Sequence, residues 1–396
     1  MSAMAEGRLP DIGAATGGKQ TLASGFRGWR RPGSSAIAAY VSSTVRFASL
    51  VVPVLGWLVL LLSGAGFGSP LLTCLILIGV VIAAVHHAET VAHRVGEPFG
   101  TLILAIAVTV IEVGLIVSLM LANREAASTL ARDTVFAAGM IILNLLLGLC
   151  LIAAAKHQKE ARFTRTGATA ALSTLATLMV LTLVLPNFTT TVSGPIYSPP
   201  QLAFVAAFSL LLYLTFVFVQ TVGNRDYFLP KGQLQAENVH AEPPSDKETW
   251  ISFAVLLVSL AAVVLLAKSL SGWLEAAVAS ANAPRALVGV AIAGIVLLPE
   301  GVAAVRAARA NRLQTSLNLA LGSALATIGL TIPAVTVTSF VLGLPLSLGL
   351  DGKGIILLAL TLFVGALSLA RGRTTLLHGA VHIVIFGAYL LTTILP

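Results

Sequence analysis

A succession of about eleven apolar stretches dominates this sequence, each close to the roughly twenty residues that a helix needs to cross a bilayer. They run approximately over residues 47–65, 70–88, 98–122, 130–155, 168–187, 201–222, 250–271, 285–305, 315–342, 354–370 and 374–395. Only 10% of the residues are charged, against roughly 25% in a soluble domain. Such a chain cannot cover itself with a solvated surface, so the sequence predicts an all-α polytopic membrane protein.

The stretches divide the chain into five parts. We expect residues 1–46 to form a disordered cytoplasmic tail and residues 47–69 to form one extra N-terminal transmembrane helix. Residues 70–222 and 250–396 each hold five stretches, and the polar residues 223–249 between them predict a cytoplasmic linker. Because five is odd, the second block enters the membrane from the opposite side. The pattern therefore predicts two inverted five-helix repeats, which place a substrate site at their interface near the bilayer midplane.

The basic residues indicate the orientation. With the amino terminus in the cytoplasm and eleven spans, 19 of the 24 Lys and Arg residues fall on the cytoplasmic side and 5 on the other. The carboxyl terminus is then extracytoplasmic. The net charge of +8 reflects this asymmetry of short loops, so nucleic acid is not an expected partner.

Two glutamates lie far inside apolar stretches. Glu112 and Glu300 are each the single carboxylate in the second stretch of a five-helix block. A carboxylate in hydrocarbon costs roughly 2.5 kcal/mol or more, so such residues normally face the bundle interior and bind an ion, a proton or a partner. An inverted repeat brings the two together, where they can hold a cation. Desolvation and mutual repulsion favour their protonated forms once the cation leaves.

Neighbouring residues suit a site of this kind. Pro299 removes a backbone N–H directly before Glu300 and frees a carbonyl of the preceding turn. Polar residues recur in the stretch that follows each glutamate: Asn144, Ser323 and Thr327. Helix packing is the alternative role for the small and hydroxyl residues.

A histidine-rich string, HHAETVAH, contains His86, His87, Glu89 and His93. Its spacing differs from the His-Glu-x-x-His of zinc proteases. We expect a cluster at the cytoplasmic mouth that titrates near neutral pH, or else a plain interfacial role. His378 and His382 lie one turn apart in the last stretch, and we expect them to be packing or interfacial residues. We expect Asp133 either to line the exit path of the ion or to cap a helix.

Two strings resemble the α-repeats of the calcium/cation antiporter superfamily, most closely its bacterial calcium/proton branch of the ChaA type. They are AETVAHRVGEPFGTLILAIAVTVIEVGLI with DTVFAAGMIILNLLLG, and LVGVAIAGIVLLPEGVAAVRAARANRLQTSLNLALGSALATIGLTIP. The resemblance covers nearly everything from about Val45 onward. It implies that Glu112 and Glu300 bind the cation and that Thr109 stands where vacuolar relatives carry an asparagine. It also implies that four residues match the second helix of each repeat: Gly139, Asn144, Gly322 and Ser323.

The sequence departs from the family pattern before each glutamate. Thr109-Val110-Ile111 and Leu297-Leu298-Pro299 replace the Gly-Asn-Ala of vacuolar relatives, so fewer side-chain oxygens are available. The resemblance implies a secondary active antiporter of a bacterial inner membrane that exchanges calcium for protons by alternating access, with sodium or potassium as the alternative cation. It implies no cofactor and no enzymatic activity, and its partners are small inorganic cations and the lipid bilayer.

The residues alone are also compatible with two other classes of protein. An intramembrane metalloenzyme would use His86, His87, His93 and Glu89 to bind zinc. A passive channel would conduct without a proton gradient, whereas a buried titratable pair favours coupled exchange.

Overall fold

The computed structural model describes residues 34–64, 66–96, 99–122, 127–156, 160–228, 244–281, 284 and 286–395. Within them, eleven helices are long and apolar enough to cross a membrane. These spans are Phe47–Gly64, Pro70–Val95, Ile103–Leu121, Ser128–Ala155, Arg165–Phe188, Pro199–Gly223, Asp246–Leu270, Ala286–Arg309, Leu313–Leu342, Gly352–Leu369 and Leu376–Ile394. The prediction of an all-helical polytopic membrane protein with about eleven spans is confirmed.

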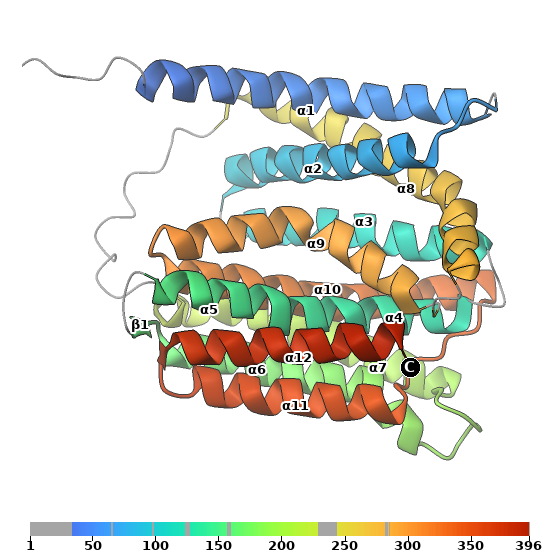
Figure 1. The fold of residues 1–396 in the computed structure, drawn as a ribbon, viewed down its shortest axis with the longest axis vertical. Coiled ribbons are helices and arrows are strands. Elements are labelled where there is room, and N and C mark those ends of the chain that lie inside the picture. Colours follow the sequence, from blue (N-terminus) through green and yellow to red (C-terminus); the bar gives the residue numbers. More distant parts are fainter. Residues whose placement is uncertain are drawn as a thin grey trace, which may run out of the picture. The chain divides into compact units, whose positions relative to one another are not determined.

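The helices carry the labels of Figure 1. They are α1 (Ser34–Gly64), α2 (Pro70–Val95), α3 (Phe99–Ala122), α4 (Ala127–Met140), α5 (Leu147–Ala155), α6 (Arg165–Met179), α7 (Pro199–Phe218), α8 (Asp246–Ser280), α9 (Ala286–Arg309), α10 (Leu313–Leu342), α11 (Gly352–Leu369) and α12 (Leu376–Ile394). Short π-helical segments continue three spans: η1 (Ile141–Leu146), η2 (Val180–Val184) and η4 (Val219–Gly223). Two 3₁₀ turns, η3 (Leu185–Phe188) and η5 (Arg225–Tyr227), complete the helical segments.

The chain divides into two compact units, Met1–Phe47 and Ala48–Pro396. In the first unit the described part is helical from Ser34, whereas residues 1–46 were expected to be a disordered tail. No Gly or Pro interrupts the chain between Ser34 and Phe47, and its alanines favour helix, so the helix of the first span extends backwards. Residues 1–33 lie outside the described residues, as do residues 229–243 of the expected linker.

In the second unit, contacts between helices occur in matched pairs. Helix α3 contacts α10, and its counterpart in the other block, α9, contacts α4. Helix α10 also contacts α6 and α7, while the matching segments η1 and α5 contact α11 and α12. Figure 1 shows these helices side by side, with α10 among helices of both blocks. Each block therefore packs its third span into the other block, as two interlocked repeats require.

A small residue permits one of these close approaches. A Cβ atom on Gly289 of α9 would lie 2.9 Å from the backbone of Asp133 and Thr134 on α4. Membrane helices associate by such van der Waals packing, because lipid supplies no hydrophobic driving force between them. Gly289 thus lets the helix that carries Glu300 lie directly against the other block.

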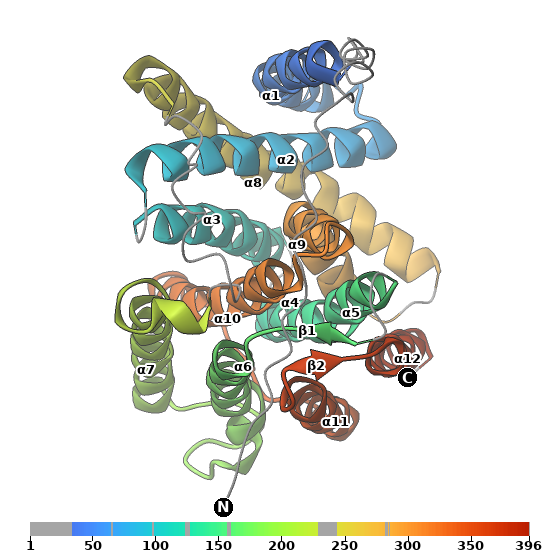
Figure 2. The same ribbon diagram turned by 90° about the vertical axis from the view of Figure 1, so that its left-hand side faces the viewer.

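Two short strands are the one departure from an all-helical chain among the described residues. Strand β1 (Ala161–Arg162) and strand β2 (Arg373–Thr374) pair antiparallel, with Ala161 opposite Thr374 and Arg162 opposite Arg373. Figure 2 shows them side by side where the connection before α6 meets the connection before α12. The pair joins loops from the two blocks at one end of the helices.

Candidate functional site

The two glutamates predicted from the sequence lie on α3 and α9, which contact one another. Glu112 is 2% exposed, and Glu300 is partly buried and lines a cavity of about 390 Å³. The two carboxyl groups are close enough to interact electrostatically. Glu112 is therefore enclosed by the protein, whereas Glu300 borders a cavity.

Helix α10 presents a row of hydroxyl groups to both carboxyl groups. Thr331 Oγ1 donates a hydrogen bond of 3.0 Å to Glu112 Oε2, and Ser323 Oγ donates to Glu300 Oε2. Thr327 lies between them in sequence, interacts with the Glu112 carboxyl group and borders the cavity. Residues spaced by four share one face of a helix, so a single face of α10 serves both glutamates.

One oxygen of this site has no partner among the described residues. Glu112 Oε1 is buried and accepts no hydrogen bond from the described part of the chain. A buried polar atom without a partner carries a substantial free-energy cost and calls for an explanation such as a bound ion or a proton on that oxygen. The unpaired oxygen marks the position at which an ion or a proton can bind.

The other accessory residues are distributed unevenly. Thr109 lines the same cavity as Glu300, and its hydroxyl donates to the Ala105 carbonyl oxygen at 2.8 Å. Pro299 lies inside α9, which the structure describes as continuous from Ala286 to Arg309. The irregular backbone among the described spans lies in the π-helical segments, of which η1 contains Asn144.

Asn144 makes its hydrogen bonds with other residues than the two glutamates. Its amide nitrogen donates to Thr361 Oγ1 at 2.9 Å, and its amide oxygen lies 3.3 Å from His382 Nδ1. His382 Nε2 in turn lies 3.1 Å from Ser368 Oγ. All four residues are at most 1% exposed, so Asn144 belongs to a separate buried network that ties η1 to α11 and α12.

His382 was expected to be a packing or interfacial residue, and the structure instead places it at the centre of this network. The sequence shows only polar residues in three different spans, 144, 361 and 382, with nothing to indicate that they meet. His378 is not part of the network, because its Nδ1 interacts with the N–H and hydroxyl of Thr375 at the start of α12.

The histidine-rich string lies on α2. His87 is buried, and its Nε2 is 3.2 Å from the Ser49 carbonyl oxygen, while His86 packs edge-on against His87. Glu89 is exposed and interacts electrostatically with Glu300, whereas His93 lies in the last turn of α2. No group of three or more His, Cys, Asp or Glu residues within the described segments could hold a metal ion.

Asp133 lies near the start of α4, away from a helix cap. Its carboxylate forms an ion pair of 2.8 Å with Arg132, which also donates to the Gly349 carbonyl oxygen at 3.1 Å. The residue lines a small cavity of about 130 Å³ beside Tyr389 and Asp351. Asp133 is therefore not a helix cap, and its role in an exit path stays a prediction.

Thr331 is the residue of the site that sequence reasoning missed. It lies in the string LALGSALATIGLTIP, eight residues after Ser323 and therefore on the same helix face. A search for hydroxyl residues four and eight positions after Ser323 would have found it. Tyr213, on α7, also borders the cavity and carried no sequence signal.

Comparison with known proteins identifies the family. A sequence profile described as sodium/calcium exchanger protein matches residues 66–222 and 251–395. The chain belongs to the sodium/calcium exchanger family. This confirms the resemblance to the calcium/cation antiporter superfamily, and the family is one of transporters.

Two relatives of the exchanger extend over most of its length. It is 48% identical over 342 residues to a Sinorhizobium fredii protein named as an ionic transporter (y4hA), covering 85% of this chain and 89% of the relative. It is 34% identical over 353 residues to the sodium-potassium/proton antiporter ChaA of Escherichia coli, covering 87% and 95%.

Solved structures share the fold of this exchanger. Native YfkE gives a TM-score of 0.68 at 14% identity and covers 88% of this chain and 100% of that chain. The H+/Ca2+ exchanger CAX gives 0.65 at 15% identity, covering 87% and 88%. At these identities the likeness shows that the chain has the exchanger fold.

Proposed function

We propose that this exchanger moves a cation in one direction and protons in the other, with Glu112 and Glu300 holding the cation and the protons in turn. The observation that carries the proposal is that hydroxyls on one face of α10 bond to both carboxyl groups, with the buried Glu112 Oε1 left unpartnered among the described residues. An uncompensated charge is costly at this depth, so the pair must be neutralised by whatever is bound.

Charge balance supports exchange. Two carboxylates carry two negative charges, which one divalent cation or two protons neutralise equally. Since both ligands need the same oxygens, they compete for one site, and the site returns across the membrane only when one of them is bound. This competition couples the two fluxes and requires no further chemistry from the protein.

Calcium is the cation that we propose first. It takes about six to eight oxygen ligands, and two carboxyl groups with the hydroxyls of Ser323, Thr327 and Thr331 come near that number. The structure of CAX, which is named as an H+/Ca2+ exchanger, supports a fold of this type but not the cation.

Sodium or potassium is the second candidate. The Escherichia coli relative, 34% identical, is named as a sodium-potassium/proton antiporter. Asn144, the amide that was expected beside the two carboxyl groups, bonds instead to Thr361 and His382. A monovalent cation needs less charge compensation, and one remaining proton would balance it.

The matched helix contacts support two inverted repeats, residues 70–222 and 250–396, related across the α3–α9 contact. The two segments of the family match, residues 66–222 and 251–395, have nearly the same bounds. We propose alternating access by movement of these repeats in a bacterial inner membrane, with the amino terminus in the cytoplasm and the carboxyl terminus outside.

The purified full chain in liposomes with an acidic interior tests the function. A pH-sensitive dye inside reports the gradient after calcium, sodium or potassium is added outside, and empty liposomes are the control. We expect calcium to dissipate the gradient. Dissipation by sodium or potassium alone would assign the second candidate. Dissipation by none of the three, or an ionic current without a pH gradient, would contradict antiport.

A further inference from the structure

A ring of arginines surrounds a cavity at one end of the helices, and its lining shares no residue with that of the cavity beside Glu300. The cavity has a volume of about 510 Å³, and its rim includes Arg162, Arg165, Arg312 and Arg371. Its described lining contains no Asp or Glu. Four positive charges therefore border one concave space without an acidic residue to offset them.

The rim is formed by three connections between helices, and backbone hydrogen bonds hold each connection in place. Arg162 lies on β1, which pairs with β2. The Arg312 N–H donates to the Ala307 carbonyl oxygen at 2.9 Å, closing the tight turn between α9 and α10. Next to Arg371, the Gly372 carbonyl oxygen accepts from Phe163 N–H at 3.0 Å, and Gly372 has the left-handed φ of 63° that favours glycine.

The floor of the cavity is rigid as well. Gln314 is 4% exposed, and its side-chain oxygen accepts from the Thr164 N–H at 2.6 Å. Its amide nitrogen donates to Asn318 Oδ1 at 2.9 Å. The floor thus joins the start of α10 to the chain just before α6, and its polar groups are satisfied.

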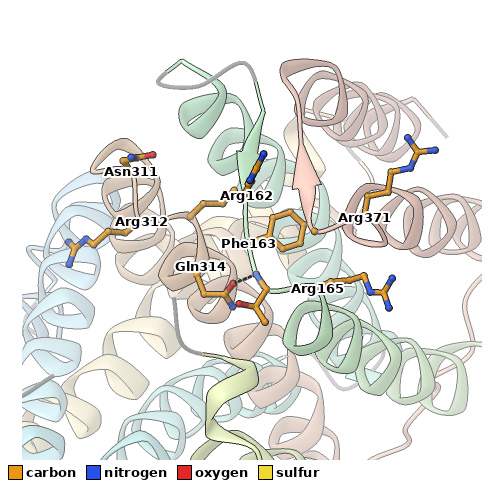
Figure 3. A pocket seen from close by; sticks show the side chains of 10 residues that line it. Arg162, Phe163, Arg165, Asn311, Arg312, Gln314 and Arg371 are labelled. Atoms are coloured by element: carbon orange, nitrogen blue, oxygen red, sulfur yellow. Dashed lines mark hydrogen bonds between the residues drawn. The ribbon is translucent and has the colours of Figure 1, made fainter. Parts of the chain in front are cut away.

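The guanidinium groups of the four arginines, in contrast, have no ion-pair partner among the described residues. All four arginines are exposed, and none forms an ion pair within the described residues. Figure 3 shows the side chains of Arg162, Arg165, Arg312 and Arg371 spreading outward from the rim. A fixed backbone with free cationic ends can close on an anion without rearranging the helices.

The strand pair places two like charges opposite one another, and a bound anion would relieve their repulsion. Arg162 lies directly opposite Arg373 across the strands, and like charges in that position destabilise a pair. Glu160 balances Arg373 through an ion pair of 3.2 Å. No acidic residue in the described part of the chain does the same for Arg162.

We propose that this arginine-lined cavity binds a phosphate-bearing anion. Guanidinium groups bind phosphate oxygens in pairs of parallel hydrogen bonds, and basic pockets at the ends of transmembrane helices receive anionic headgroups. Helix α10 also begins at the rim without a side-chain cap, and its first N–H groups add to the positive potential. A lipid headgroup and free phosphate share this chemistry. The inference goes beyond the proposed transport function and does not depend on it.

The test uses the full chain in neutral detergent and measures thermal unfolding against added phosphatidylglycerol, phosphatidylcholine or inorganic phosphate. We expect phosphatidylglycerol or inorganic phosphate to raise the unfolding temperature, and phosphatidylcholine to do so less. An effect of the lipid alone assigns the headgroup as the source, and an effect of inorganic phosphate assigns the free anion.

Two double variants probe the rim, Arg162→Gln with Arg312→Gln, and Arg165→Gln with Arg371→Gln. Each removes two of the four charges and should weaken the apparent affinity by about tenfold or more. The matched control is Arg306→Gln with Arg309→Gln, an equal charge change in the last turn of α9 that leaves the cavity lining intact.

Two results overturn the proposal. One is an absence of stabilisation by both anions in the parent protein. The other is an equal loss of affinity in the control and rim variants, which would show attraction by bulk charge only. If one rim variant does not fold, the other carries the same comparison.

Discussion

At the scale of single residues, the site depends on hydroxyl groups that hold two carboxyl groups in place. Thr331 and Ser323 each donate to one glutamate, and both lie on one face of α10. A hydroxyl group is neutral, so it can orient a carboxyl oxygen whether that oxygen carries a proton or faces a cation. The glutamates supply the charge, and α10 supplies the geometry.

Replacing these hydroxyls is expected to weaken cation binding without abolishing exchange. Thr331→Val or Ser323→Ala removes one hydrogen bond to a charged group, and we expect the apparent affinity for the cation to fall by about tenfold. Flux at saturating cation should be retained, because both carboxyl groups remain. The measurement is flux in liposomes as a function of cation concentration.

Thr338→Val is the matched control for this prediction. Thr338 lies on the same helix, and its hydroxyl donates only to the Ala334 carbonyl oxygen within that helix. Its replacement should leave the affinity unchanged. If Thr331→Val and Thr338→Val behave alike, the contact between α10 and Glu112 has no role in binding.

At the scale of helices, η1 is the segment on which sequence and structure differ most. The polar network of Asn144, Thr361, Ser368 and His382 is buried and hydrogen-bonded throughout. A π-helical segment is often found at functional sites, but here its asparagine anchors two neighbouring helices. The network fixes the position of α4 and α5, against which α9 packs.

His382→Ala is therefore expected to destabilise the fold. It leaves Asn144 Oδ1 and Ser368 Oγ without a partner and opens a cavity, at a cost of about 2–4 kcal/mol in the free energy of unfolding. Thermal unfolding in detergent measures the change, and cation affinity of the folded fraction should stay near that of the parent.

His378→Ala provides the comparison, because that side chain only caps the start of α12 and should cost about 1 kcal/mol. A His382→Ala protein that unfolds like the parent but no longer exchanges ions would show that the network belongs to the transport path.

At the scale of the whole molecule, the distribution of charge predicts the orientation. The 19-to-5 division of basic residues predicts that a reporter after Pro396 lies outside the cytoplasm and that one inserted near Gln235, beyond the described residues, lies inside. Fusions to alkaline phosphatase and to green fluorescent protein at both positions measure this. A cytoplasmic carboxyl terminus would contradict the topology of eleven spans.

Much of this architecture could be predicted from the sequence because hydrocarbon imposes simple limits. Each span must be about twenty apolar residues, and Glu112 and Glu300 stand out because little else in the spans is charged. Partners across helices could not be predicted. A serine, threonine or histidine satisfies its hydrogen bonds on any neighbouring helix, so the role of Thr331 and the place of Asn144 depend on packing that apolar periodicity does not specify.

The central claim is that Glu112 and Glu300 are the carriers, and replacing each by glutamine tests it most directly. Glutamine keeps the shape but removes the charge and the proton acceptor, while insertion into the membrane should be no less favourable. Asp351→Asn is the control, because Asp351 caps α11 through Gly354 N–H at 2.8 Å and asparagine caps equally well.

The measurement is proton-driven calcium, sodium and potassium flux for the three variants at equal amounts of protein in liposomes. The account predicts flux at the level of empty liposomes for Glu112→Gln and for Glu300→Gln, and parental flux for Asp351→Asn. Near-parental flux in either glutamate variant would contradict the mechanism of paired carboxylates.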